Sequence, residues 1–446
     1  MNADIVIIGG GAAGIGAARR LAQSGLSTLL LEASSRLGGR AWTHEVAGLN
    51  IDLGCGWLHS AERNAWVGIA EVGGVPIDRS PAQWGAQYRD LGFPPAEQAE
   101  ARRAFATWMH KLQASRSPGD RASDALAPSG EWNTYIRTVV GFISGGDLER
   151  LSVADYLAYD EASSDNNWRA PSGLGSLVAR SFPAKVELRL GTAVDSISLE
   201  SQGVTVRTPA GDIRARAALL TVSTAVLTGD VLKLPAEVAP WREAASTLPL
   251  GHNEKLFLRV DGGPFEKETQ LLGDPRSART ASYYIRPMGR PLIECFFGGE
   301  GARFVSEDGQ AAGFDFAMEQ LCALFGSAIR SSLRPLTGSL WSQMQHIGGA
   351  YSYALPGYDA ARRTLARPFG IVCSSRARRP VQETSPRCMV RMTAACGPRT
   401  KPSRRCRADS QSTAPCKTPS RPRRAAIDAC LRDCNSVSAG EESGTN

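Results

Sequence analysis

Residues 4–14 read Asp-Ile-Val-Ile-Ile-Gly-Gly-Gly-Ala-Ala-Gly. The apolar, β-branched half ends directly in glycine, which predicts a short buried strand over residues 4–8. The Ala- and Leu-rich residues 12–24 predict a helix with Gly25 as its stop, and residues 27–31 predict a second buried strand. Strand, helix and strand at this spacing form a βαβ unit, so we expect a parallel sheet and an α/β fold.

The glycines of this stretch fit the fingerprint of a dinucleotide-binding loop. Gly9 permits the tight turn, Gly11 lets the backbone approach a pyrophosphate, and Gly14 lets the helix pack against the strand. Glu32 lies 18 residues beyond Gly14, at the end of the second strand, where it can accept hydrogen bonds from both hydroxyls of an adenosine ribose. The alternative, a glycine-rich turn of another α/β fold, does not account for this carboxylate.

Two further motifs narrow the kind of dinucleotide. Gly38-Gly39-Arg40 can bring backbone amides and a guanidinium onto the same pyrophosphate, and residues 52–59 read Asp-Leu-Gly-Cys-Gly-Trp-Leu-His. With these motifs the sequence resembles the flavin-containing amine oxidase family, which includes monoamine and polyamine oxidases, L-amino-acid oxidases and tryptophan 2-monooxygenase. The resemblance is carried by four segments: residues 4–59, 186–223, 246–258 and 336–357.

The resemblance implies FAD as the cofactor and assigns it a binding set. Glu32 binds the adenosine ribose, Arg40 and the glycine loop bind the pyrophosphate, and Val194 offers its backbone to the adenine. Gly56 and Trp57 lie along the flavin. The full cofactor-binding set implied by the resemblance is Gly9, Gly11, Ala13, Gly14, Glu32, Ala33, Gly39, Arg40, Gly56, Trp57, Val194 and Trp341.

The family's reaction is hydride transfer from the carbon next to an amine nitrogen to the flavin, giving an imine; O2 then reoxidises the flavin and yields hydrogen peroxide. The expected partners are therefore a small-molecule amine and O2. Lys255 matches the family's lysine near the flavin, and a strand-end lysine snorkelling to solvent is the alternative. His59 matches a histidine beside the flavin that suits a proton acceptor, and a hydrogen-bonded structural histidine is the alternative.

Aromatic side chains are the candidates for the amine pocket. Tyr351 belongs to a segment that resembles the family's pocket wall, and Trp168 lies near a second glycine-rich connection; core packing is the alternative for such aromatics. The substrate stays open between a primary amine, a polyamine and an amino acid. An amino acid would need an arginine for its carboxylate, and the candidates are Arg79, Arg89 and Arg169.

The distribution of elements predicts an FAD-binding Rossmann-like domain with a parallel sheet, interwoven with an α+β substrate domain. The FAD-binding domain is expected over residues 1–75 and 176–245, and the substrate domain over 76–175, mainly helical, and 246–365. Further helices are expected over residues 97–114, 131–143 and 311–333. Further strands are expected over residues 186–190, 193–197, 204–208, 216–222, 255–260, 281–285 and 292–297.

The net charge of +7 and the ten cysteines are concentrated in one part of the chain. Residues 371–446 carry a net charge of +9 and seven cysteines, which leaves residues 1–370 with a charge of −2. Residues 1–370 therefore give no reason to expect a nucleic-acid partner or a disulfide scaffold. Neither these residues nor residues 371–446 show the ligand spacing of a metal site. No apolar run reaches the ~18–20 residues that span a bilayer, so we expect a cytoplasmic protein without a membrane partner. The sequence does not indicate the oligomeric state.

Residues 366–446 are expected to be an aberrant, disordered tail, because the resemblance to the family stops near Pro368. The codon table suggests a frameshift between codons 358 and 373. Read from the third base of each codon, Met389-Val390 forces glycine, and residues 373–379 permit Phe-Phe-Ala-Gly-Glu-Ala, which resembles the family's last cofactor segment. A genuine disordered basic tail is the alternative.

Three other functions stay open beside an active amine oxidase. The chain could be an inactive or damaged amine-oxidase homologue that lacks its last FAD-binding segment. It could be another FAD-dependent desaturase or oxidase of the same superfamily, although Lys255 and the Gly-Trp-Leu-His stretch argue against this. It could bind nucleic acid through its basic tail, although no aromatic residue accompanies that charge.

Overall fold

The computed structural model describes residues 2–114 and 119–368. Its N-terminal βαβ unit is the one predicted: β1 (Ala3–Ile8), α1 (Ala12–Leu21) and β2 (Thr28–Leu31), with β1 and β2 parallel. The helix ends at Leu21 rather than at residue 24. The Ser24 hydroxyl donates to the Leu21 carbonyl at 2.7 Å and accepts from the Leu26 amide, so this side chain supports a turn in place of another helical turn.

The βαβ unit belongs to a six-stranded sheet in the order β5-β2-β1-β8-β7-β6. The first four strands are parallel, whereas β7 and β6 continue the sheet as antiparallel strands. The strand expected over residues 193–197 begins only at Ser196, because residues 192–194 line a cavity instead of pairing. The remaining strands of this sheet are β5 (Glu187–Arg189), β6 (Ser196–Glu200), β7 (Gly203–Thr208) and β8 (Gly211–Leu220).

The second sheet is antiparallel and has the order β10-β11-β12-β9-β13. Its apolar face packs against the long helix α9 (Glu300–Phe325). α9 has a kink at Gly309, where φ is +92°, and the helix predicted over residues 311–333 matches the stretch after the kink as far as Phe325; the stretch before the kink was not predicted, and residues 327–332 form a 3-10 helix instead. The strands are β9 (Asn253–Val260), β10 (Thr269–Leu272), β11 (Ser282–Ile285), β12 (Leu292–Gly298) and β13 (Leu333–Gly338).

A helical region covers one side of the second sheet, where α4 packs against β12. Its three helices, α3 (Pro95–Ala114), α4 (Asn133–Ser144) and α5 (Val153–Glu161), include the two predicted over residues 97–114 and 131–143. The hairpin of β3 (Thr43–Val46) and β4 (Leu49–Asp52) was not predicted. The other helices are α2 (Ala65–Val72), α6 (Leu174–Arg180), α7 (Thr224–Thr228), α8 (Ala239–Ser246) and α10 (Ala361–Leu365), with 3-10 turns at Tyr88–Asp90, Ala122–Ala125, Ala236–Val238, Pro287–Gly289 and Trp341–Gln343.

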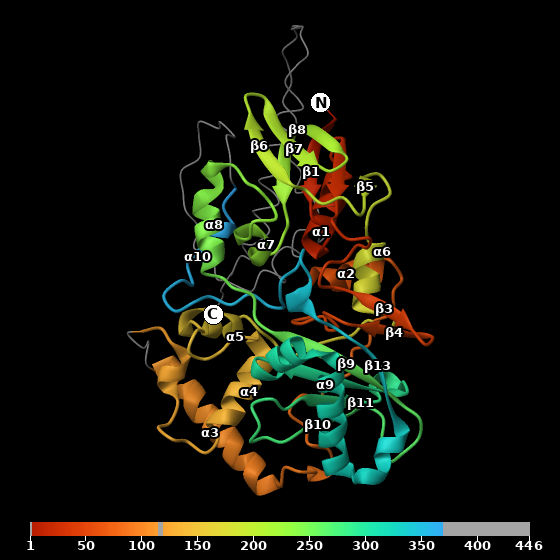
Figure 1. Ribbon diagram of the computed structural model, residues 1–446, viewed down its shortest axis with the longest axis vertical. Helices are drawn as coiled ribbons and strands as arrows, with labels where there is room; N and C mark the ends of the chain where they lie inside the picture. Colours follow the sequence, from red (N-terminus) through yellow and green to blue (C-terminus); the bar gives the residue numbers. More distant parts are fainter. Residues whose placement is uncertain (1, 115–118, 369–446) are drawn as a thin grey trace, which may run out of the picture.

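Segments that are distant in sequence share each half of the molecule. In Figure 1 the six-stranded sheet occupies the upper end, and the antiparallel sheet with the helical region occupies the lower end. The chain passes repeatedly between these halves, as expected for interwoven domains, although the exact domain boundaries stay a prediction. Within the described ranges, no helix is long and apolar enough to cross a bilayer.

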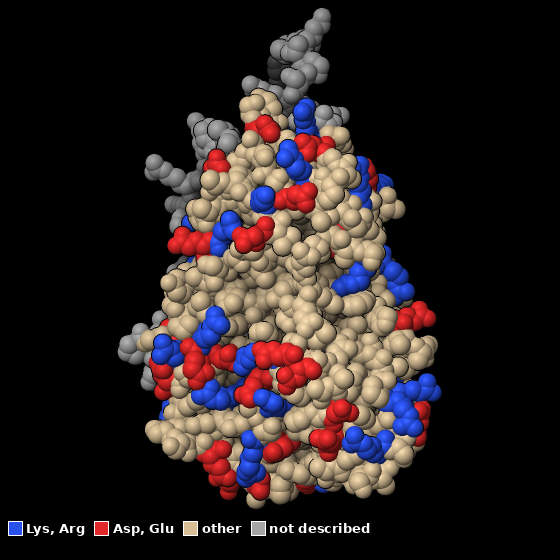
Figure 2. Space-filling model, in the orientation of Figure 1, with Lys and Arg blue, Asp and Glu red and all other residues tan. Residues whose placement is uncertain are grey.

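Charged side chains of both signs lie side by side on the face shown in Figure 2, and a largely uncharged band crosses its middle. That face therefore offers no extended surface of a single charge. The predicted aberrant tail, residues 366–446, falls almost entirely on residues 369–446, which lie outside the described residues; the interval predicted for the frameshift, codons 358–373, begins in the described part and ends beyond it.

Candidate active site

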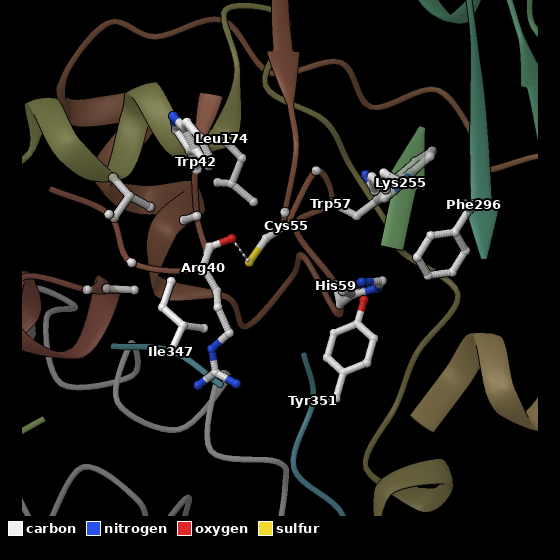
Figure 3. A pocket seen from close by; sticks show the side chains of 18 of the residues that line it. Arg40, Trp42, Cys55, Trp57, His59, Leu174, Lys255, Phe296, Ile347 and Tyr351 are labelled. Atoms are coloured by element: carbon white, nitrogen blue, oxygen red, sulfur yellow. Dashed lines mark hydrogen bonds between the residues drawn. The ribbon is translucent and has the colours of Figure 1, made fainter. Parts of the chain in front are cut away.

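A single cavity of about 1030 Å3 joins the two halves of the molecule. It begins at the carboxyl ends of β1 and β2, the edge where open parallel sheets bind their ligands, and it extends to β9, β11 and β12 of the second sheet. Figure 3 shows Arg40 on one side of the cavity, and Trp57, Lys255, Phe296 and Tyr351 on the other.

The glycine loop after β1 has the geometry predicted for it. Gly9 has a φ of +105°, and Thr221 at the end of β8 donates a hydrogen bond to its carbonyl at 2.9 Å. A Cβ on Gly14 would lie 1.9 Å from the Gly9 carbonyl oxygen, so only glycine lets α1 approach β1 this closely. Gly11 and Ala13 line the cavity, whereas Gly14 acts through packing.

The Glu32 carboxylate is held in place at the end of β2. The Gly10 amide donates to its Oε2 at 2.6 Å, and the Ser34 amide and hydroxyl both donate to its Oε1 at 2.8 Å. Glu32, Ala33 and Val194 all line the cavity, as expected for the adenosine side of the cofactor site. The carboxylate is thus oriented before any ribose binds.

The Gly-Gly-Arg motif packs directly against the glycine loop. Gly39 has a φ of +58°, and a Cβ at this position would lie 3.1 Å from the Gly11 Cα. Arg40 lines the cavity and donates a hydrogen bond to the Ala350 carbonyl, so its guanidinium is held between the two loops. Burial lowers the pKa of the neighbouring Arg36 to about 10, against the opposing effect of the Glu32 charge.

The Gly54–Trp57 loop leaves no space for a side chain at Gly54, whereas a Cβ on Gly56 would make ordinary van der Waals contacts. A Cβ on Gly54 would lie 1.8 Å from the Arg40 carbonyl oxygen, and a Cβ on Gly56 would lie 3.4 Å from the Lys255 Nζ. Asp52 anchors the loop, because its carboxylate accepts hydrogen bonds from the Leu174 amide at 2.9 Å and the Gly175 amide at 3.1 Å at the start of α6. The loop is therefore fixed from both sides.

Lys255 is a buried, partnered lysine and does not snorkel to solvent. Its Nζ lies 2.9 Å from the Glu294 Oε1 and donates to the Asp52 carbonyl at 3.4 Å; the lysine and glutamate side chains are 9% and 18% exposed. Lys255 pairs with Phe296 across β9 and β12, so Glu294 is its diagonal neighbour on the same face. Lys255 and Glu294 both line the cavity.

His59 lines the cavity and also makes the structural hydrogen bond considered as its alternative. Its Nδ1 lies 2.8 Å from the Asn167 Oδ1, and the Asn167 amide group donates to the Ser164 and Asp165 carbonyls. Since the amide oxygen only accepts, Nδ1 carries the hydrogen, and Nε2 is the accepting nitrogen of the neutral ring. In Figure 3 the Tyr351 hydroxyl points toward the His59 ring.

The structure does not bring two of the predicted residues to the cavity wall. Trp341 is 4% exposed and packs in the core behind the Gly54–Trp57 loop, where its indole N–H donates to the Leu53 carbonyl at 3.2 Å. Trp168 packs beneath the Arg79 guanidinium, 4.9 Å from its carbon. Both are therefore placed where they support cavity loops rather than contact a ligand.

None of the three candidate arginines for a substrate carboxylate lines the cavity. Arg79 pairs with Glu71 at 2.8 Å, Arg89 pairs with Glu266, and Arg169 is surrounded by two carboxylates.

Glu294, Tyr284 and Trp84 are among the cavity residues that were not predicted from the sequence. Glu294 carried a usable signal, since it is the one carboxylate in the apolar run Leu292–Gly298. Tyr284 and Trp84 carried none, because aromatic residues in a strand or a loop are as often structural. Trp84 packs edge-on against Trp57 with 4.8 Å between ring centroids, and Tyr284 stacks on Trp57 at 6.3 Å and 18°.

The residues present fit FAD. The cavity combines a glycine-lined loop, an oriented carboxylate for a ribose and an arginine near the loop, and then continues past Gly56 to Lys255. In residues 2–114 and 119–368, no group of three or more His, Cys, Asp or Glu side chains is arranged to hold a metal ion.

Comparisons with known proteins agree with this geometry. The family described as flavin containing amine oxidoreductase matches residues 12–74 and 84–375. Pseudooxynicotine dehydrogenase from Pseudomonas sp is 29% identical over 298 residues, which span 58% of this chain and 59% of that relative. Polyamine oxidase 2 from Arabidopsis thaliana is 24% identical over 398 residues, covering 79% of this chain and 78% of that protein.

Two solved structures show the same fold. A double mutant of putrescine oxidase matches with a TM-score of 0.61 and 16% identity, covering 81% of this chain and 89% of the other. Cyclohexylamine oxidase from Brevibacterium oxydans IH-35A matches with a TM-score of 0.60 and 19% identity, covering 82% and 91%. The fold class predicted from the sequence is confirmed.

Proposed function

Because the chain belongs to the flavin-containing amine oxidoreductase family, we propose that it oxidises the C–N bond of a small amine to an imine with FAD as its cofactor. One observation carries the proposal: a single cavity holds both the dinucleotide loop with Glu32 and the buried Lys255–Glu294 pair. A structural or purely binding protein does not need a buried ion pair at the far end of a cofactor cavity.

Each end of the cavity has its own task in this proposal. The glycine loop and Arg40 hold the pyrophosphate, Glu32 holds the ribose, and Gly56 and Trp57 lie along the flavin. FAD supplies the hydride acceptor for the carbon next to the amine nitrogen. The protein positions that carbon and keeps bulk water away with the aromatic wall that includes Trp57 and Tyr284.

Lys255 and His59 handle protons in the proposed reaction. The Glu294 carboxylate and the Asp52 carbonyl hold the Lys255 ammonium in one orientation, from which it binds a water beside the reaction centre. His59 donates through Nδ1 to Asn167, so its Nε2 is the nitrogen that accepts a proton from an ammonium substrate.

The cavity favours an amine without a carboxylate. Its substrate half is rich in aromatic side chains, and the three predicted carboxylate-binding arginines lie elsewhere. Arg102 lines the cavity, but its Nη2 already donates to the Gly85 carbonyl and the Gln98 Oε1. We therefore rank a primary amine or a polyamine above an amino acid.

The electron acceptor separates two versions of this function. Reoxidation by O2 with release of hydrogen peroxide is our first proposal. The alternative is transfer of the electrons from the reduced flavin to an acceptor other than O2. Two relatives are named as dehydrogenases, pseudooxynicotine dehydrogenase and nicotine dehydrogenase, which supports this alternative. Oxygen consumption compared with reduction of an added dye acceptor distinguishes them.

No nucleic-acid partner is included in the proposal, and the proposed location is the cytoplasm. Cell fractionation checks the location. Binding to DNA that weakens steeply with salt would contradict the absence of a nucleic-acid partner.

Anaerobic addition of a primary amine or a polyamine to the FAD-loaded chain tests the function. We expect loss of the oxidised-flavin absorbance with the wild type, and at least about a tenfold slower loss with Lys255→Met. Lys185→Met, which removes an exposed lysine, is the matched control and should behave as the wild type. A flavin-loaded chain that no amine reduces would refute the proposal.

A further inference from the structure

Arg169 connects two segments that border the amine cavity. It lies in the loop before α6, where its amide donates to the Asp78 carbonyl at 3.0 Å and the Asp78 amide donates back at 2.8 Å. Its residue is only 6% exposed. A buried arginine requires polar partners, so the contacts of Arg169 indicate its structural role.

The Arg169 side chain has partners on three other segments. Its guanidinium donates to the Asp78 carboxylate, to the Glu268 Oε2 at 3.1 Å and to the Tyr284 hydroxyl. Its central carbon also lies 5.2 Å from the ring centroid of Trp57 and 5.5 Å from that of Tyr284. A planar, five-donor group can make all of these contacts at once, whereas an ammonium cannot.

The two aromatic rings that Arg169 contacts form one wall of the cavity. Trp57 and Tyr284 both line it and lie nearly parallel. Tyr284 on β11 pairs with Glu294 on β12, which places it beside the carboxylate that holds Lys255. Any displacement of Tyr284 therefore reaches the reaction centre.

The backbone around Glu268 adopts conformations that side chains ordinarily avoid. Glu268, Arg286 and Met288 have φ values of +56°, +44° and +53°. Such conformations are unfavourable for non-glycine residues and persist where the surroundings fix them. Here they keep the Glu268 carboxylate in place, since the Met288 amide donates to its Oε1 and the Tyr284 hydroxyl donates to its Oε2.

We propose that Arg169 is a positioning residue for amine binding: from outside the cavity it fixes the Trp57–Tyr284 wall against which the amine packs. This inference rests on the proposed function. It predicts that Arg169 affects the affinity for the amine rather than the fold alone, because the guanidinium is the shared contact of both rings.

Arg169→Lys tests the inference, and Arg79→Lys is the matched control. Arg79 also stacks on a tryptophan and pairs with a glutamate, but it does not line the cavity wall or contact it. Near-ultraviolet circular dichroism of the full, FAD-loaded chain without amine reports the order of the aromatic wall. Benzylamine is then mixed with the chain without O2, and the dependence of the flavin reduction rate on the benzylamine concentration gives the Kd. We expect Arg169→Lys to lower the aromatic signal and to raise the benzylamine Kd about tenfold, and Arg79→Lys to change the Kd less than about twofold.

Each outcome decides the inference. An unchanged aromatic signal and an unchanged Kd in Arg169→Lys overturn it, even if the melting temperature falls. If the wild type does not bind benzylamine, the proposed function fails for this amine, and the aromatic signal alone then supports or overturns the positioning role.

If Arg169→Lys does not fold, Tyr284→Phe and Glu268→Gln carry the test. Each removes one partner without opening a large cavity, and each should raise the Kd about threefold. Wild-type values in both variants overturn the inference.

Discussion

Replacing Glu294 with leucine leaves the Lys255 ammonium inside the molecule, where the Asp52 carbonyl, 3.4 Å away, is its one remaining hydrogen-bond partner among the described residues. Breaking a buried ion pair by removing one partner costs about 3–5 kcal/mol. The two side chains are 9% and 18% exposed and line the cavity, so we expect the lower limit, about 3 kcal/mol of unfolding free energy, for Glu294→Leu. Lys255→Met should cost about the same, because it leaves the carboxylate unpaired.

The double variant Lys255→Met/Glu294→Leu should lose no more than either single variant, because no buried charge remains. The coupling free energy is then at least about 3 kcal/mol, the upper end for residues in contact. Urea unfolding at pH 7.5, followed by tryptophan fluorescence, measures all four chains.

The exposed pair Arg137–Glu149, at 2.6 Å, is the control for this cycle. Its side chains are 40% and 50% exposed, so the same cycle should give a coupling below about 1 kcal/mol. Additive losses in the Lys255–Glu294 cycle would refute the reasoning, since they would show that the two charges do not stabilise each other.

Three further results are expected. Gly54→Ala should weaken FAD binding at least about tenfold, because its Cβ would lie 1.8 Å from the Arg40 carbonyl oxygen. Gly68→Ala is the control, since the space around Gly68 is open, and it should bind FAD as the wild type does. Equilibrium dialysis compares the two variants. Burial raises the pKa of Glu254 from 4.5 to about 7. Its contribution to stability is therefore complete below pH 4.5 and is lost as the pH rises through 7, which lowers the unfolding free energy by at most about 3 kcal/mol. Glu254→Gln should remove this pH-dependent loss when unfolding is measured at pH 4.5 and at pH 8. Resequencing codons 358–373 should reveal the frameshift, and an unbroken frame in independent DNA would contradict the hypothesis. A chain with the frame restored should retain FAD through gel filtration better than the chain of the present sequence.

The elements that the sequence predicted well are those whose signal is local. Glycine in the turn after β1 is required by a φ of +105° at Gly9 and by the 1.9 Å approach at Gly14, and both constraints lie within a few residues of chain. Helix ends were less predictable. The side chain of Ser24 ends α1 early, and the unpredicted stretch of α9 before the kink at Gly309 packs Ala302 and Val305 into the core of the second sheet.

The candidate site was predicted where one motif carries both position and chemistry, as at Glu32 and Arg40. Trp341 and Trp168 were predicted for the site but lie behind its loops, since a motif does not indicate which face of a tryptophan meets the cavity. Glu294 was missed because its partner Lys255 lies 39 residues earlier in the chain, and only the pairing of β9 with β12 brings them together.

The sequence by itself determined the βαβ unit, the glycine loop after its first strand, and the candidate site residues Glu32 and Lys255, because each depends on residue types at short spacing. The tertiary structure decided that Lys255 is charge-paired, that His59 is oriented by Asn167, and that Arg169 stands behind the aromatic wall. These are contacts between segments 39, 108 and 112 residues apart. Their geometry is set by sheet register and loop packing, which no local pattern of residues encodes.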